Sequence, residues 1–172
     1  RKGYPYVSVF EDAIPTLFCE TLIGKFERNE SQEQVVTDFK EVRHFTEVNI
    51  TQHWQEEHDI FVTLVMDAWR MYLSTHQITL NQQWPKQFGY EQFRMKRYLP
   101  NGIDEFALHT DVGSYPSARR FVSFLWYLND VPQGGQTCFG QYQEYPSLMI
   151  EAKRSRLLIF PPLWTHPHWG SK

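Results

Sequence analysis

The chain has 172 residues, of which 41% are hydrophobic and 16% aromatic, and its formal net charge is -3. This length favours a single domain, and without a membrane-spanning apolar run or a charged-then-apolar leader we expect a soluble, cytoplasmic protein with no membrane partner. The mixed charges argue against a nucleic-acid partner, and two distant cysteines, Cys19 and Cys138, exclude a disulfide framework and indicate a reducing compartment.

Two amphipathic helices are predicted in the first half of the chain. From Pro15 to Asn29, apolar residues recur at three- and four-residue steps, and proline is well suited to the first turn of a helix. A longer helix is expected from about Trp54 to Thr75, where one face is apolar and acidic residues favour the N-terminal end. We expect both helices to support a sheet.

After Pro85 the sequence changes to short β-branched and aromatic runs separated by turn residues, as in antiparallel sandwiches and barrels. The predicted strands span residues 89–98, 104–109, 120–128, 136–139, 147–150, 156–161 and 165–169. Such strands preceded by helices predict a mostly β fold with supporting α-helices and a double-stranded β-helix core of the jelly-roll or cupin-like type. We expect one domain over residues 1–172, with helical support over about 1–85 and the β core over about 86–172.

A candidate metal site begins at the end of the second predicted strand, where the sequence reads "HTD". Alternate side chains of a strand share a face, so His109 and Asp111 can reach one ion together. A pair this short also arises by chance. The C-terminal segment "LLIFPPLWTHPHWG" adds two histidines, and two imidazoles with one carboxylate form the ligand set preferred by non-haem Fe(II) oxygenases.

Longer motifs carry a family resemblance. The segments "YLPNG", "HTD", "RRFVSFLWYLND", "VPQGGQTCF" and "RLLIFPPLWTHPHWG" occur in this order between about Phe93 and Gly170. In these motifs the chain resembles the Fe(II)- and 2-oxoglutarate-dependent dioxygenases, in the branch that contains the catalytic domain of prolyl 4-hydroxylases. The resemblance covers nearly half of the chain.

The resemblance implies a set of metal ligands. It makes His109 and Asp111 the first two iron ligands. It favours His168 as the third, because the distal histidine of the family stands directly before one residue and a glycine, as in "HWG". His166, two residues earlier, is the competitor for this role.

Two tyrosines match positions of the family that contact the cosubstrate. Tyr127 matches a tyrosine that hydrogen-bonds the distal carboxylate of 2-oxoglutarate, and Tyr98 matches one that lines the same pocket. The alternative is that both are ordinary aromatic residues of the barrel.

The activity that the resemblance implies is hydroxylation of a C–H bond, with Fe(II), the cosubstrate 2-oxoglutarate and O2, and with ascorbate (vitamin C) as the reductant. It favours a prolyl residue of a peptide or protein as the substrate. A small molecule or a free amino acid stays open, because a fold does not determine a substrate. A non-catalytic jelly-roll module that binds a metal or another ligand is the alternative, and the sequence determines no oligomeric state.

The family normally anchors the far carboxylate of 2-oxoglutarate with a lysine or arginine beyond the distal histidine, whereas this sequence ends at Lys172. Three explanations are open. The first, which we favour, is that the last core strand belongs to a C-terminal tail omitted from this sequence. In the other two, the anchor is replaced by Lys172 or by a basic residue of another strand. Arg119 and Arg120, at the start of a predicted strand, either neutralise a substrate or cosubstrate acid or face solvent.

Overall fold

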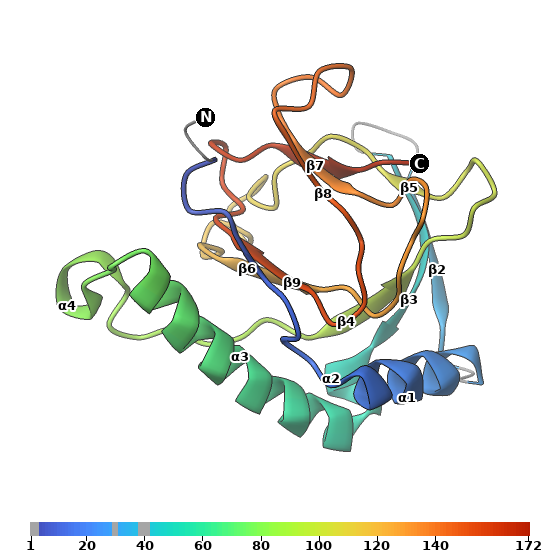
Figure 1. Cartoon of the computed structure of the whole chain (residues 1–172), viewed down its shortest axis with the longest axis horizontal. Helices are drawn as coiled ribbons and strands as arrows, with labels where there is room; N and C mark the ends of the chain where they lie inside the picture. The colour runs from blue at the N-terminus through green and yellow to red at the C-terminus, as the bar shows by residue number, and fades with distance from the viewer. Residues whose placement is uncertain (1–3, 29–30, 38–41) are drawn as a thin grey trace.

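The computed structural model describes residues 4–28, 31–37 and 42–172 (Figure 1). The helices in these ranges are α1 Thr16–Glu27, α2 Ile50–His53, α3 Gln55–Thr75 and α4 Leu80–Gln83. The strands are β1 Ser8–Phe10, β2 Glu33–Thr37, β3 Arg43–Asn49, β4 Arg94–Arg97, β5 Glu105–Phe106, β6 Ser123–Trp126, β7 Thr137–Phe139, β8 Leu148–Ile150, β9 Leu157–Phe160 and β10 His168–Gly170.

The strands surround a barrel-like centre. They form the sheets β1-β9-β6, β10-β7-β8 and β2-β3-β4, and β5 adds to the last of these by pairing with β3. Every pairing between them is antiparallel. In Figure 1 the sheet of β7, β8 and β10 lies across the centre from β4, β6 and β9, and the helices α1 and α3 lie outside the barrel on the side of β4, β6 and β9.

Strand β9 explains this layered arrangement. Its Leu157 and Ile159 pack in one apolar cluster with α3, whereas Leu158 and Phe160 pack in another with β7 and β8. Because successive side chains of a strand point to opposite faces, β9 contacts the helix on one face and the opposite sheet on the other. All four residues are at most 2% exposed, so β9 reads in the sequence as a continuous apolar run.

The N-terminal helices cover the neighbouring part of the barrel. Leu22 and Phe26 of α1 belong to an apolar cluster that also holds Val48 of β3, and Met95 of β4 packs against it. The side chains of Val48 and Met95 therefore point out of the barrel toward α1. Their neighbours along β3 and β4 point the other way, toward the centre.

The predicted helical character of residues 1–85 is incomplete, because β1, β2 and β3 lie in this part of the chain. Strand β3 has no regular apolar alternation. Glu47 is buried in β3, where its carboxylate lies 2.6 Å from the guanidinium of Arg94 in β4. A paired charge inside the barrel interrupts the apolar pattern by which such a strand is recognised.

The remaining predicted elements occur at the expected places, and most of them are shorter than predicted. The first predicted helix is α1, and Asn29, its expected end, lies outside the described residues. The second is α3, preceded by the separate short helix α2. The seven predicted strands correspond to β4 through β10, of which β5 has only two residues.

Cys19 and Cys138 are free, as their separation in the sequence predicts, and both are buried. Among the helices in the described ranges, none is both long enough and apolar enough to cross a membrane.

Candidate metal centre

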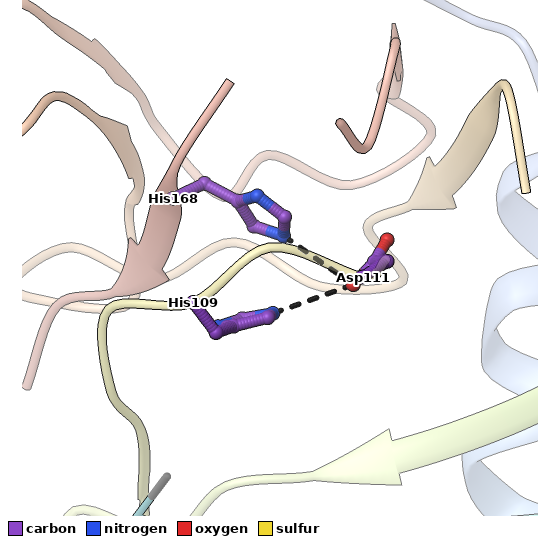
Figure 2. A group of neighbouring side chains, drawn as sticks. All are labelled: His109, Asp111 and His168. Atoms are coloured by element: carbon purple, nitrogen blue, oxygen red, sulfur yellow. Dashed lines mark ion pairs between the residues drawn. The ribbon is translucent and has the colours of Figure 1, made fainter. Parts of the chain in front are cut away.

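Three side chains that the sequence analysis singled out converge in the structure (Figure 2). One ligand atom from each of His109, Asp111 and His168 lies within 4.8 Å of the others, a spacing that suits a metal ion. Asp111 Oδ1 lies 3.4 Å from Nε2 of His109 and 3.7 Å from Nε2 of His168. The carboxylate thus faces both imidazoles through one oxygen.

Backbone pairing places these residues together. The amide of His109 donates to the carbonyl of His168, and the amide of His168 donates to the carbonyl of His109, both at 2.9 Å. The amide of Asp111 donates to the carbonyl of Pro162 at 3.1 Å. The group therefore rests on hydrogen bonds between segments that are far apart in the sequence.

Both imidazoles are held in the tautomer that a metal requires. Nδ1 of His109 lies 2.7 Å from the carbonyl oxygen of Ala107, and Nδ1 of His168 lies 3.0 Å from that of His166. A carbonyl oxygen only accepts, so each Nδ1 carries the proton and donates. The lone pair of each Nε2 is left toward the centre of the group, the arrangement seen when the outer nitrogen of a metal-bound histidine is fixed by a backbone carbonyl.

The charge states also suit a metal. Burial raises the pKa of Asp111, but the contact with the His109 imidazole, the nearby His168 and the hydroxyl of Ser123 outweigh it and lower this pKa to about 2. Burial and the neighbouring His109 lower the pKa of His168 to about 4, against the opposite influence of Asp111. At neutral pH the group therefore offers an ionised carboxylate and a neutral His168.

Two further residues hold the ligands, and the sequence analysis did not identify either. The hydroxyl of Ser123 in β6 donates to Asp111 Oδ2 at 2.9 Å, which leaves Oδ1 toward the imidazoles. The ring of Phe106 in β5 is stacked on the His109 imidazole, with centroids 3.6 Å apart and planes 6° apart. Both residues lie in predicted strands, but only the pairing of strands brings Ser123 to Asp111.

His166, the competitor, points elsewhere. Its Nε2 lies 2.7 Å from the carbonyl oxygen of Pro5, and its Nδ1 lies 2.8 Å from the hydroxyl of Thr165. The ring of Tyr4 packs against the His166 ring with centroids 5.2 Å apart. His166 therefore ties the N-terminal segment to the loop before β10, and His168 is the histidine that joins the group.

The two tyrosines differ in their surroundings. Tyr127 donates a 2.6 Å hydrogen bond to the hydroxyl of Thr137, and burial raises its pKa to about 12 although this hydrogen bond acts in the opposite direction. Tyr98 packs on Phe45 with ring centroids 5.2 Å apart and is 43% exposed. Contact with a cosubstrate stays a prediction for both.

A cavity of about 380 Å³ lies directly beside the metal group. Its walls are formed by Asp111, Thr110 and the turn of residues 113–117, together with Arg43 of β3 and Arg120. Of the predicted arginine pair, Arg120 thus lines the cavity, whereas Arg119 is exposed and does not. Lys172, the last residue, forms a 3.0 Å ion pair with Glu105.

The fold has close counterparts among solved structures, although no family model and no curated protein sequence matches the chain. A prolyl-4-hydroxylase from Pseudomonas putida is 20% identical with a TM-score of 0.64, and the match covers 96% of this chain and 84% of that one. A prolyl hydroxylase from Trichoplax adhaerens, in complex with a peptide fragment of the hypoxia inducible factor oxygen degradation domain, is 15% identical with a TM-score of 0.71 and coverages of 96% and 76%. A viral collagen prolyl hydroxylase from Paramecium Bursaria Chlorella virus-1 is 17% identical with a TM-score of 0.61 and coverages of 96% and 87%.

These likenesses confirm the predicted fold class. The chain has the double-stranded β-helix fold of the prolyl hydroxylases, mostly β with supporting helices, over nearly its whole length. At these identities the likeness establishes the fold, and the chemistry must be argued from the residues of the site.

Proposed function

We propose that the chain is an Fe(II)- and 2-oxoglutarate-dependent oxygenase that hydroxylates a prolyl residue of a peptide or protein. The convergence of His109, Asp111 and His168 carries this proposal. Two imidazoles and one carboxylate on one side of an ion leave other coordination positions open, the arrangement that non-haem Fe(II) oxygenases use.

His109 and His168 would hold the iron through Nε2, and Asp111 through Oδ1. When bound, the iron with 2-oxoglutarate and O2 supplies an oxidant strong enough to cleave a C–H bond, and the protein supplies the geometry. The backbone carbonyls at both Nδ1 atoms and the Ser123 hydroxyl at Oδ2 keep the three ligand atoms aimed at one point.

The cosubstrate would lie against Tyr127 and Tyr98. The raised pKa of Tyr127 keeps its phenol protonated at neutral pH, so the hydroxyl can donate to a carboxylate and does not repel it. Thr137 accepts the hydrogen bond of this hydroxyl, and its own hydroxyl can join the same hydrogen-bond network.

The ring of Phe106 would close one side of the metal. Because it lies parallel to the His109 imidazole at 3.6 Å, it excludes water from that face and fixes the plane of the ligand. An apolar wall beside the metal also limits side reactions of the oxidant with solvent.

The choice of a prolyl substrate rests on likeness of fold. The Trichoplax neighbour binds a peptide, which favours a peptide or protein over a small molecule for this chain. Since folds host different substrates, the substrate must be tested separately from the chemistry.

The test of the chemistry is 2-oxoglutarate turnover with Fe(II), with ascorbate added to keep the metal reduced. We expect succinate formation in the wild type and its loss in His109→Ala and Asp111→Ala. The control is His53→Ala, which removes an exposed histidine of α2 and should keep turnover. Turnover that persists in both ligand variants would overturn the proposal, and metal binding without 2-oxoglutarate binding would identify a non-catalytic module.

A further inference from the structure

Three loops leave the barrel beside the metal group. His168, the first residue of β10, pairs with Phe139, the last residue of β7, on one side and with His109 on the other. Beyond this row the three segments continue as loops, which comprise residues 110–118, 140–147 and 161–167. Because the pairings are antiparallel, all three loops emerge at the same rim of the barrel, the one at which the metal ligands lie.

The loop of residues 161–167 lies between the other two. Its Pro162 carbonyl accepts a hydrogen bond of 3.1 Å from the amide of Asp111, and its Pro167 carbonyl accepts one of 3.1 Å from the amide of Gly140. In Figure 1 the loop between β7 and β8, which contains Gly140, projects outward from the barrel. The three loops therefore form a continuous rim next to the metal group.

This rim carries the most exposed aromatic side chains of the described chain. Among the described residues, the Phe, Tyr and Trp side chains that are more than half exposed are Tyr115, Tyr142, Tyr145 and Trp164, at 68–94%. We call these residues the aromatic rim. Large aromatic side chains leave water favourably, so a group of them beside one cavity marks a binding surface.

Tyr115 stands on a turn that hydrogen bonds fix. The hydroxyl of Ser117 accepts hydrogen bonds from the amides of Gly113 and Ser114, at 3.1 and 3.0 Å. Ser114 and Pro116, the neighbours of Tyr115 in the sequence, both line the cavity beside the metal group. Tyr115 is therefore held at the edge of the cavity, while its ring stays in solvent.

Trp164 stands on a second fixed turn. The amide of His166 donates to the carbonyl of Leu163 at 2.8 Å, and the His166 side chain is hydrogen-bonded to the hydroxyl of Thr165 and to the carbonyl of Pro5. Aromatic side chains turn about only two torsion angles, so they bind a partner at a low cost in conformational entropy. The exposed indole of Trp164 is thus presented by a backbone that is already ordered.

We propose that the aromatic rim binds a polypeptide substrate by its apolar side chains, next to the residue that enters the cavity. The inference rests on the proposed function and adds the surface and the chemistry by which the substrate is recognised. A cavity of about 380 Å³ is at the lower end for ligand sites and suits one side chain or a small molecule. Only a chain molecule can fill this cavity and also contact Tyr142 and Tyr145 on the projecting loop.

The chemistry of the rim suits a polypeptide. Each tyrosine presents a hydroxyl and Trp164 presents an indole N–H at the edge of an apolar ring. Each side chain therefore combines a surface for an apolar side chain with a group that can hydrogen-bond a peptide backbone. Tyrosine and tryptophan are also the residues that most often dominate the binding energy of protein interfaces.

Selection from a peptide library by the inert complex of the protein with Mn(II) and N-oxalylglycine tests this inference. The peptides have a fixed central proline and randomised neighbours, and we expect enrichment of aromatic and aliphatic residues beside the proline. Trp164→Ser and Tyr115→Ser should each raise the Kd of the selected peptide about tenfold or more, because the loss of an aromatic anchor at an interface has effects of this size.

Conservative and remote variants assign the effect to the rim. Trp164→Phe keeps an apolar ring and should keep most of the affinity. Leu17→Ser removes a similarly exposed apolar side chain from α1, which lies on the other side of the barrel, and should leave the Kd unchanged. The melting temperature and the bound Mn(II) of each variant identify any defect in folding or in the metal group.

A selection without apolar enrichment would overturn the inference, as would an unchanged Kd in both serine variants. Self-association, or binding to phosphatidylcholine vesicles, that replaces peptide binding and is lost in both serine variants would also overturn it. The rim would then serve a second copy of the chain or a lipid surface.

The selection is repeated without Mn(II) and N-oxalylglycine. Rim-dependent peptide binding by a protein without 2-oxoglutarate turnover would contradict the proposed function alone. Turnover together with peptide binding that does not depend on the rim would contradict this inference alone.

Discussion

Replacing Ser123 by alanine is expected to weaken divalent metal binding about ten- to hundredfold. The Ser123 hydroxyl donates to Asp111 Oδ2 at 2.9 Å, while Oδ1 faces the two imidazoles at 3.4 and 3.7 Å. A hydrogen bond to a charged group contributes about 1.5–3 kcal/mol, and about 1.4 kcal/mol corresponds to a tenfold change in a dissociation constant. Without this bond the carboxylate can rotate, and Oδ1 no longer stays aimed at the ion.

The assay is Mn(II) titration followed by electron paramagnetic resonance, which reports the free ion. Ser123→Thr keeps a hydroxyl on a residue that suits a strand and should keep most of the affinity. Ser74→Ala, at an exposed position of α3, is the control for loss of a serine far from the site.

Equal Mn(II) affinities of the wild type and Ser123→Ala would refute this reasoning. That result would mean that the backbone alone orients Asp111, through its amide on Pro162 and its carbonyl on Arg120. A melting temperature equal to that of the wild type is needed to read a loss of affinity as a local effect.

His168→Ala is expected to abolish Mn(II) binding. His166→Ala should keep Mn(II) binding and lower the melting temperature, because His166 forms a hydrogen bond with the Pro5 carbonyl. Equal loss of metal in both variants would contradict the ligand assignment. Tyr127→Phe should raise the Kd for 2-oxoglutarate about tenfold and leave that for pyruvate, which lacks the distal carboxylate, unchanged in calorimetry; an equal effect on both would argue against the proposed contact. Leu158→Ala should lower the free energy of unfolding by about 2–5 kcal/mol in urea titrations, because the side chain is fully buried and packs from β9 against the opposite sheet. A loss under about 1 kcal/mol would contradict that packing.

Local patterns in the sequence were sufficient for part of the fold. The helices α1 and α3 follow from apolar residues at helical spacing, and β9 follows from a run of four apolar residues. His109 and Asp111 follow in the same way, since two residues separated by one on an extended chain share a face. These features depend on neighbours in the sequence and need no knowledge of the tertiary structure.

Features that depend on strand pairing could not be predicted in this way. Strand β3 was missed because Glu47 interrupts its apolar pattern at a buried position, where it pairs with Arg94 of β4. The cavity could not be predicted because its two arginines, Arg43 and Arg120, come from segments that are far apart in the sequence. Ser123 illustrates the same limit, since its role appears only when β6 is placed beside Asp111.

The register of the barrel also explains why the His168 side chain faces the metal group. His109 and His168 exchange two backbone hydrogen bonds of 2.9 Å, so this antiparallel pairing determines the direction in which their side chains point. Trp169, the next residue of β10, points to the other face and is only 4% exposed. A shift by one residue would take this indole out of its buried position and turn the His168 imidazole away, so the packing of Trp169 favours the register that presents the ligand. The tryptophan of "HWG" therefore contributes to the metal site through packing, without touching the ion.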